Sequence, residues 1–362
     1  MHAKNPARGP RPVLRLLARL ALGIAALGAA LVASSGPKPK TSYDYYLTGN
    51  PADAASSQPP RSPSTLLMGG GLDIDAAFRW MIDKGGGGDF VVIRATGADG
   101  YNQYVYAMGG VDSVESLVIP SVEAANDPFV VDHVRKAEAL FIAGGDQSDY
   151  IEFWKGTALD DAIRDLVRRN VPIGGTSAGL AVLGQFDFAA LKGSVTSAAA
   201  LANPYNHRMT LDRDFLTAAA MTGVITDSHL DERDRMGRLL AFLARLTNPG
   251  DGWISVDSAR AIGVDPSTAV AIDKGVATRV ADRDAKGVDL GGSVYFLRPS
   301  VAPMVCAPRQ PLTFRNVLVE RLSGAGSFHV KNWTGVGGAT TRYDLSAEAG
   351  VLISSQPGDG IY

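Results

Sequence analysis

Short, mostly apolar runs alternate with helix-like segments through the middle of the chain. The runs lack the strict polar alternation of a half-exposed sheet, which favours strands that are buried on both faces. We predict strands at residues 65–68, 90–93, 115–119, 139–143, 171–173 and 221–226, and helices at 75–81, 132–137 and 159–169. Because strands alternate with helices, the pattern predicts an α/β fold, a three-layer sandwich around a mostly parallel sheet.

The pattern changes on either side of this region. Residues 36–64 contain many Pro, Ser and Lys residues without periodicity, which is typical of a flexible tether. Residues 299–362 carry β-forming runs between glycine turns, so we predict a small β-rich C-terminal extension there. The α/β domain is expected to span residues 65–298.

Residues 1–35 have the pattern of an export signal. An arginine-rich start is followed by an apolar segment at 20–32 and by the small residues Ala33-Ser34-Ser35. The apolar segment has about 13 residues, fewer than the roughly 20 of a membrane span, which favours a cleaved signal peptide over an uncleaved anchor. We therefore expect a periplasmic or extracellular protein that is free of the membrane after cleavage.

Composition narrows the classes of function. The chain has 362 residues, of which 46% are hydrophobic, and its formal net charge of −2 gives no reason to expect nucleic acid as a partner. The sole cysteine, Cys306, excludes an intramolecular disulfide and is too isolated for a metal site. The glycine run at 69–71 lacks the third glycine of a dinucleotide-binding loop, because Ile74 stands in its place. We expect no cofactor.

The pentapeptide Gly175-Thr176-Ser177-Ala178-Gly179 is the strongest chemical signal. It stands between the predicted strand at 171–173 and a stretch of small residues that can begin a helix. A serine between glycines at a strand-to-helix turn is exposed as a nucleophile, and the helix start offers N–H groups to a developing oxyanion. The pattern indicates a serine hydrolase, although Gly-x-Ser-x-Gly also occurs as an ordinary turn.

A serine nucleophile needs a base, and histidine is the usual one near neutral pH. His229 follows the predicted strand at 221–226, as Ser177 follows its own strand. The other histidines are placed less well: they lie in the signal, a predicted helix, a polar loop and the extension, at His2, His133, His207 and His329. Asp227, two residues before His229, could orient the imidazole, hold a cationic substrate group or cap the next helix.

A helix is predicted after His229, and it carries Arg233, Arg235 and Arg238. Arg235 and Arg238 would lie one turn apart on one face. Guanidinium groups bind carboxylates in pairs of hydrogen bonds, so these residues could hold an acidic substrate. The alternative is local pairing with the neighbouring acids Asp231, Glu232 and Asp234.

Together, these segments resemble the cyanophycinase-type serine peptidases. Gly144-Gly145-Asp146-Gln147, the pentapeptide around Ser177 and Asp227-Ser228-His229 with its three arginines have the order and spacing of that family. The family is related to the aspartyl dipeptidases, and its flavodoxin-like fold is similar to that of class I glutamine amidotransferases, with Ser in place of Cys at the turn. The resemblance covers residues 65–298 and not the tether or the extension.

The resemblance implies a set of site residues. Ser177 would be the nucleophile and His229 the base, with an oxyanion hole from the backbone N–H groups of Gly145 and Ala178. The substrate pocket would be built from Gln147, Asp227, Arg233, Arg235 and Arg238. Members of the family cleave cyanophycin, a poly-aspartate with arginine on each β-carboxyl, into β-Asp-Arg dipeptides. Arginines for carboxylates and an aspartate for a guanidinium suit such an acidic, arginine-bearing peptide or polymer.

One departure from the family concerns the third member of the triad. The family usually has a Glu some 20 residues beyond the nucleophile, but residues 188–211 contain no Asp or Glu. Either another group, such as Asp187, Asp212 or Asp227, orients His229, or the protein is slow or inactive. Ser228 also replaces the longer polar residue that is frequent in the family, so side-chain specificity could differ.

Two alternatives stay open at this point. A generic α/β-hydrolase, such as an esterase, would take its histidine from near the end of the chain, which here is His329. A binding protein would have kept the pocket and lost the acid. The sequence does not determine the oligomeric state, and a homodimer is compatible with it.

Overall fold

The fold is described by a computed structural model, which covers residues 41–54 and 61–362. The predicted signal peptide at 1–35 lies outside the described residues, as does part of the predicted tether. No helix within the covered residues is long and apolar enough to cross a membrane.

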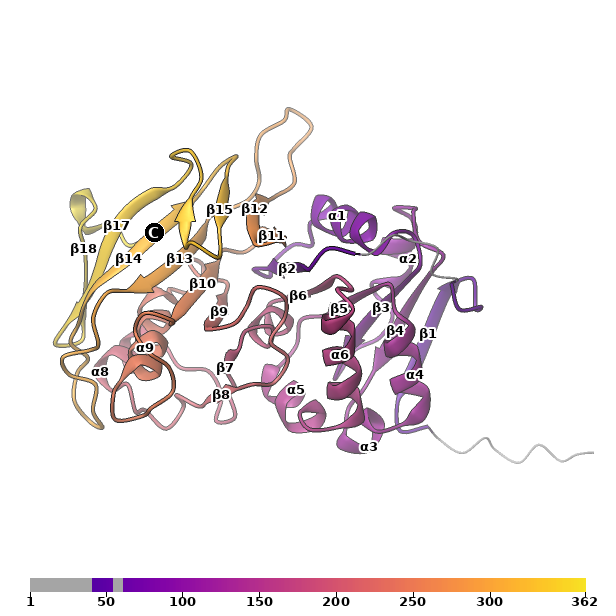
Figure 1. Cartoon of the computed structure of the whole chain (residues 1–362), viewed down its shortest axis with the longest axis horizontal. Coiled ribbons are helices and arrows are strands. Elements are labelled where there is room, and N and C mark those ends of the chain that lie inside the picture. Colours follow the sequence, from indigo (N-terminus) through magenta and orange to yellow (C-terminus); the bar gives the residue numbers. More distant parts are fainter. Residues whose placement is uncertain (1–40, 55–60) are drawn as a thin grey trace, which may run out of the picture. The chain divides into compact units, whose positions relative to one another are not determined.

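Two mixed β-sheets, with helices packed on them, form the protein (Figure 1). The first has ten strands, and its centre is parallel. The order is β1-β4-β3-β5-β6-β2-β11-β12-β15-β16, in which β4, β3, β5, β6 and β2 run parallel. The bounds of the ten strands are β1 Asp44–Gly49, β2 Ser64–Met68, β3 Asp89–Arg94, β4 Ser113–Val118, β5 Ala139–Ile142, β6 Ile173–Thr176, β11 Ala269–Asp273, β12 Val276–Val280, β15 Ser327–His329 and β16 Thr334–Gly335.

Helices cover both faces of the parallel strands, as the alternating pattern predicted. On one face Phe78 and Met81 of α1 pack with Phe90 and Phe141 of the sheet. On the other face, helices α4, α5 and α6 close a second core against the opposite side of the same strands. The helices of these two layers are α1 Asp75–Gly85, α2 Asn102–Tyr106, α3 Val122–Ala125, α4 Pro128–Lys136, α5 Gln147–Trp154 and α6 Ala158–Arg168. The α/β three-layer arrangement is confirmed.

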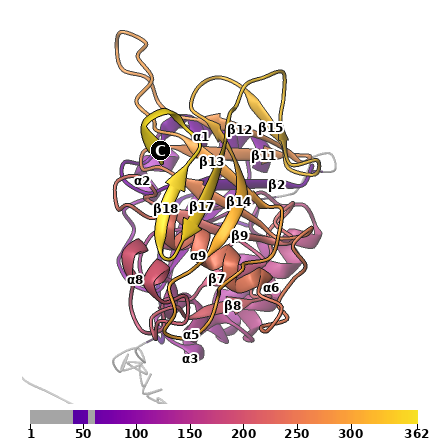
Figure 2. The ribbon, with the colours of Figure 1, turned by 90° about the vertical axis from the view of Figure 1, so that its left-hand side faces the viewer.

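The second sheet has eight strands in the order β18-β17-β14-β13-β10-β9-β7-β8 (Figure 2). Its bounds are β7 Phe186–Phe188, β8 Leu211–Arg213, β9 Val224–Ser228, β10 Arg260–Val264, β13 Val294–Pro299, β14 Phe314–Leu322, β17 Thr341–Glu348 and β18 Val351–Ser354. Helices α8, Ser197–Ala202, and α9, Met236–Thr247, pack against it in a third core. Helix α7, Ala178–Ala181, and the 3-10 helix η1, Pro357–Asp359, complete the elements.

The predicted tether and extension both contribute to these sheets. Within the predicted tether, β1 pairs antiparallel with β4, and the rings of Tyr43 and Tyr45 pack against Phe129 of α4. Of the extension, β14 pairs with β13, and β15 pairs with β12. Residues 41–362 form one compact unit, so neither segment is separate from the α/β core.

Candidate active site

Ser177 lies in a sharp turn between β6 and α7. Its φ of 53° and ψ of −112° are unusual for a residue with a side chain, and strain of this kind is frequent at nucleophiles. The flanking glycines allow the turn to form. A Cβ on Gly179 would lie 2.1 Å from the carbonyl oxygen of Ile142, and one on Gly175 would lie 2.5 Å from the backbone of Gly179. The pentapeptide therefore forms the predicted turn.

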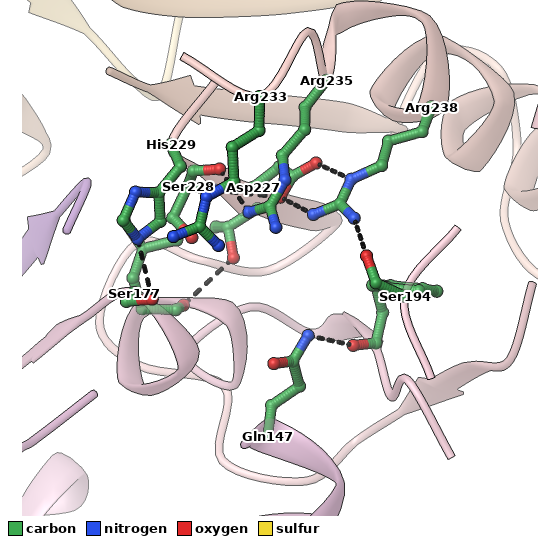
Figure 3. A network of polar contacts seen from close by, with 12 residues as sticks. Gln147, Ser177, Ser194, Asp227, Ser228, His229, Arg233, Arg235 and Arg238 are labelled. Carbon is green, nitrogen blue, oxygen red and sulfur yellow. Dashed lines mark hydrogen bonds and ion pairs between the residues drawn. The ribbon is translucent and has the colours of Figure 1, made fainter. Parts of the chain in front are cut away.

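His229 directly follows β9 and faces Ser177. Its Nε2 lies 3.1 Å from the Ser177 Oγ (Figure 3). The backbone fixes the residue from the other side, since the His229 N–H donates to the Gly69 carbonyl over 2.8 Å. Gly70 has a φ of +87°, and a Cβ there would lie 2.2 Å from Nε2. The glycine run at 69–71 thus provides the surface against which the imidazole packs.

Glu232 holds the other nitrogen of the imidazole. Its Oε2 lies 2.7 Å from His229 Nδ1, which completes a Ser–His–Glu arrangement. The acids expected at this position are elsewhere, which corrects the sequence analysis. Asp187 is fully buried, and its carboxylate oxygens have no partner among the described residues. Asp212 pairs with Lys155 over 2.6 Å, and Asp227 pairs with Arg238.

The electrostatics of this pair favour a neutral imidazole that can accept a proton. Burial lowers the pKa of His229 below its usual 6.5, and the hydrogen bond to Glu232 opposes that shift. The same hydrogen bond lowers the pKa of Glu232 and keeps it ionised. Since Glu232 has 53% of its side chain exposed, solvent screens its charge, and its main effect is to orient the ring.

Asp227 and Arg238 form a buried ion pair at the back of the site (Figure 3). The guanidinium Nε and Nη2 donate to the two carboxylate oxygens over 2.7 and 2.6 Å, and Nη1 donates to Ser194 Oγ over 2.9 Å. Asp227 also accepts the Ser228 N–H over 2.9 Å. Asp227 therefore neither caps a helix nor offers a free carboxylate to a substrate cation. Both roles were considered in the sequence analysis, and both are wrong.

The arginine-bearing segment is a turn followed by a helix, and not one continuous helix. We name residues 230–235 the arginine turn; α9 begins after it, at Met236. The turn forms because His229 and Asp234 have φ values of 50° and 46°, which no α-helix accommodates. Arg235 is consequently at the N-cap of α9, and the predicted one-turn spacing to Arg238 on a helix face is wrong.

Arg235 is a partly buried cation with unused donor capacity. Its Nη1 donates to the Ser228 carbonyl over 2.7 Å and lies 3.7 Å from Asp227, a carboxylate that Arg238 already neutralises. Burial lowers the pKa of Arg235 to about 10, so the group stays charged at neutral pH. Arg233 has 50% of its side chain exposed and lies 3.6 Å from Glu232.

These residues line one pocket together with the serine. Gly145, Gln147, Ser177, Ala178, Asp227, Arg233, Arg235 and Arg238 all contribute to its wall. Gln147, at the start of α5, donates through Nε2 to the Phe188 carbonyl over 3.2 Å (Figure 3). The N–H groups of Gly145 and Ala178 bond to no acceptor within the described part of the chain. They are available to a substrate oxygen beside Ser177.

The remaining described histidines are not bonded to Ser177. His133 Nδ1 lies 2.6 Å from Glu115, His329 is part of β15, and His207 is exposed in a loop. His2 lies outside the described residues. Of the histidines that the structure describes, His229 is the one at the serine.

Comparisons with known proteins identify relatives of this chain. The profile of peptidase family S51 matches residues 97–192. Cyanophycinases from Nostoc sp. and from Trichormus variabilis are each 28% identical to this chain over 228 residues. The chain is a relative of the cyanophycinase-type serine peptidases. The alignments cover 61% of this chain and 66% of each cyanophycinase, so they span just under two thirds of the length of those relatives.

Two solved structures are also similar to this relative of the cyanophycinases. A peptidase from an acI-B1 Actinobacterium superposes with a TM-score of 0.47 at 17% identity, over 75% of this chain and 98% of the other. A putative peptidase E from Listeria monocytogenes gives a TM-score of 0.41 at 13% identity, over 61% of this chain and 99% of the other. The assignment rests on the sequence comparisons and on the site.

Glu232 is the functional residue that sequence reasoning missed. It was considered only as a local partner of the arginines. The signal that could have identified it is the spacing of three residues from His229, which suits a carboxylate folding back within one turn. Because a regular helix was predicted there, that geometry was not considered.

Proposed function

We propose that this protein is an exported serine exopeptidase of cyanophycinase type that cleaves cyanophycin or related β-aspartyl peptides. The observation that carries the proposal is the chain of two hydrogen bonds from Ser177 Oγ through His229 to Glu232, of 3.1 and 2.7 Å. Nucleophile, base and orienting acid within hydrogen-bond reach are the arrangement that acyl transfer requires.

The first step is attack of Ser177 on the scissile carbonyl. His229 Nε2 takes the hydroxyl proton as the Oγ–carbon bond forms, and it then gives this proton to the leaving amine as the amide bond breaks. A water molecule attacks the resulting ester, with His229 again as base, and releases the acid product and the free serine. Glu232 keeps Nδ1 protonated and Nε2 free to accept, and its charge stabilises the imidazolium between the two transfers.

The oxyanion that forms during each attack needs fixed donors. Ala178, at the start of α7, and Gly145, in the loop between β5 and α5, both line the pocket beside Ser177 and carry the candidate N–H donors. Such preorganised donors contribute about 3–4 kcal/mol each in serine hydrolases. This supports them as the oxyanion hole.

The cationic wall suits an acidic substrate. Arg233 and Arg235 project from the arginine turn toward the serine side of the pocket, while Arg238 is occupied by Asp227 (Figure 3). In a poly-aspartate with arginine on each β-carboxyl, the bond cleaved to release β-Asp-Arg is a backbone amide, and the free carboxylates near it are those of the linked arginine residues. These two guanidinium groups are complementary donors for such carboxylates. Asp227 is already paired with Arg238, so a substrate guanidinium would need another carboxylate. Asp146 is such a carboxylate, because it also lines the pocket.

Product analysis tests the proposal. Purified protein is incubated with cyanophycin and with matched α- and β-aspartyl peptides, and the products are identified by mass spectrometry. Release of β-Asp-Arg is expected from the wild type, with loss in Ser177→Ala and His229→Ala and retention in His329→Ala. Activity that depends on His329, or turnover of esters but of no peptide, would instead support a generic esterase.

Export is tested separately. The arginine-rich start and the apolar segment at 20–32 motivate it. We expect the mature N-terminus, determined on protein recovered from the periplasm or medium, to lie close to Ala33-Ser34-Ser35. Recovery of full-length protein from the cytoplasm alone would contradict this part of the proposal.

A further inference from the structure

Tyr362, far from Ser177 in the sequence, contacts the arginine turn. Its hydroxyl donates to Asp234 Oδ1 over 2.9 Å. The same hydroxyl accepts the N–H of Met236, the first residue of α9, over 3.2 Å. One side chain of the C-terminal extension therefore joins the last part of the arginine turn to the start of the helix that follows it.

Helix α9 depends on such remote partners because its own N-cap is poor. Arg235 stands at the N-cap and provides no side-chain acceptor. The first N–H groups of a helix have no partner within the helix and need one from outside. Tyr362 supplies an acceptor for Met236, and Ser197 Oγ accepts the N–H of Arg238 over 3.1 Å. These two hydroxyls take the place of a local cap.

Asp234 also needs external support. Its φ of 46° lies in the left-handed region, which is unfavourable for a residue with a side chain and persists only where the surroundings hold it. Three contacts do so: its N–H donates to the Asp231 carbonyl, its carbonyl accepts from Ser197 Oγ, and its carboxylate accepts from Tyr362. Tyr362 is the one of these partners that comes from the extension.

The tyrosine is itself held in place by residues of the second sheet and of the chain next to it. The Tyr343 hydroxyl on β17 donates to the Ile361 carbonyl over 2.8 Å. The ring of Tyr362 lies edge-on to that of Tyr295 on β13, with centroids 6.2 Å apart. The contact with Asp234 is thus anchored in the second sheet, through two strands.

We infer that Tyr362 is a positioning residue for the arginine turn, and that one role of the C-terminal extension is to fix the groups that contact substrate. The turn carries Glu232, Arg233 and Arg235, so its conformation sets both the orientation of His229 and the anion-binding wall. The effect on substrate rests on the proposed function, whereas the effect on the turn does not.

A matched pair of substitutions tests this inference. Tyr362→Phe removes the hydroxyl and keeps the ring. Tyr205→Phe is the control at the other end of α9: the Tyr205 hydroxyl likewise donates to an aspartate, Asp251 at 2.9 Å, and it accepts from the side-chain amide of Asn248 at 2.6 Å. Each variant loses one bond donated by the hydroxyl and one accepted by it, so similar global stability is expected, and thermal unfolding checks it.

Hydrogen exchange measured by mass spectrometry reports on the turn directly. We expect amides of residues 231–238 to exchange about five- to tenfold faster in Tyr362→Phe, which is the scale of losing a cap on a helix start. Tyr205→Phe should leave these amides unchanged and affect the end of α9 instead. Equal exchange of residues 231–238 in both variants would overturn the inference.

Binding separates this inference from the proposed function. In a Ser177→Ala background, which prevents turnover, calorimetry with β-Asp-Arg should show about five- to tenfold weaker affinity on adding Tyr362→Phe and no change on adding Tyr205→Phe. If the dipeptide binds to neither protein while exchange at 231–238 still rises, the substrate assignment fails and the positioning role stands. Unchanged affinity together with unchanged exchange would refute the positioning role.

Discussion

Substitution of Glu232 tests the least expected part of the site. Its carboxylate lies 2.7 Å from His229 Nδ1, in the position of the acid of a catalytic triad. Loss of a buried orienting acid costs about 10⁴-fold in turnover in serine proteases. Because 53% of the Glu232 side chain is exposed, solvent screens its charge, and a smaller loss is expected. We predict about a 100-fold lower kcat for Glu232→Ala.

Glu232→Gln distinguishes orientation from charge. Its amide oxygen can still accept from His229 Nδ1, since solvent leaves the side chain free to rotate, so we predict only about a tenfold loss in kcat, the effect of the missing charge on the imidazolium. The assay is the initial rate of β-Asp-Arg release from cyanophycin at saturating polymer, measured by mass spectrometry. Glu123→Ala, an exposed glutamate on α3, is the control.

The pH profile provides a readout that a purely structural role would not change. A nearby carboxylate stabilises the protonated imidazole, so its removal lowers the pKa of His229 further below 6.5. The acid limb of kcat/KM should therefore shift to lower pH in both Glu232 variants. A wild-type rate with an unshifted acid limb in Glu232→Ala would show that Glu232 does not act on His229.

Three further predictions concern groups around the site. Gly70→Ala should lower kcat at least about 100-fold. The new Cβ would lie 2.2 Å from His229 Nε2 and would displace the imidazole, and a displacement of about 1 Å is enough for such a loss. Asp227→Asn should lower the free energy of unfolding by about 3–5 kcal/mol in denaturant titrations, since it leaves Arg238 buried beside a neutral partner. Burial raises the pKa of Asp187 well above its usual value of 3.8, so the wild type loses stability as the pH rises above the unfolded-state pKa; Asp187→Asn should therefore lose less stability than the wild type over that rise in pH.

Each of these has a control. Gly71→Ala places a side chain at a similarly unfavourable φ, +78° compared with +87° at Gly70. Its Cβ would contact Pro266 and not the imidazole, so this variant should retain much more activity than Gly70→Ala. Asp165→Asn breaks an exposed ion pair with Arg169 and should cost less than about 1 kcal/mol. A parallel pH dependence of stability in wild type and Asp187→Asn would show that the buried carboxyl does not titrate as inferred.

Local signals predicted the parts of the site that depend on short segments. The turn around Ser177 follows from two glycines and a strand-to-helix boundary, all within five residues. His229 was found because few histidines compete with it and because it follows a strand, as Ser177 does. Parallel strands bring their carboxyl ends to one edge, and this places the two residues together.

The parts that were missed depend on contacts between distant segments. Glu232 lies in a turn between His229 and Asp234, whose φ values of 50° and 46° are not helical, and Tyr362 contacts Asp234 from far along the chain. The arginine turn was therefore predicted as a helix. Likewise β1 was predicted as part of a tether, since a short strand in a segment rich in Pro and Ser is recognised only from the strand with which it pairs.

In the proposed mechanism, His229 activates Ser177 as a nucleophile. The most direct measurement is the rate of covalent labelling by a fluorophosphonate, with the modified residue located by peptide mapping. We expect a single adduct on Ser177 in the wild type, and labelling slowed by at least about 100-fold in His229→Ala. An adduct elsewhere, or labelling of Ser177 at the same rate without His229, would contradict it.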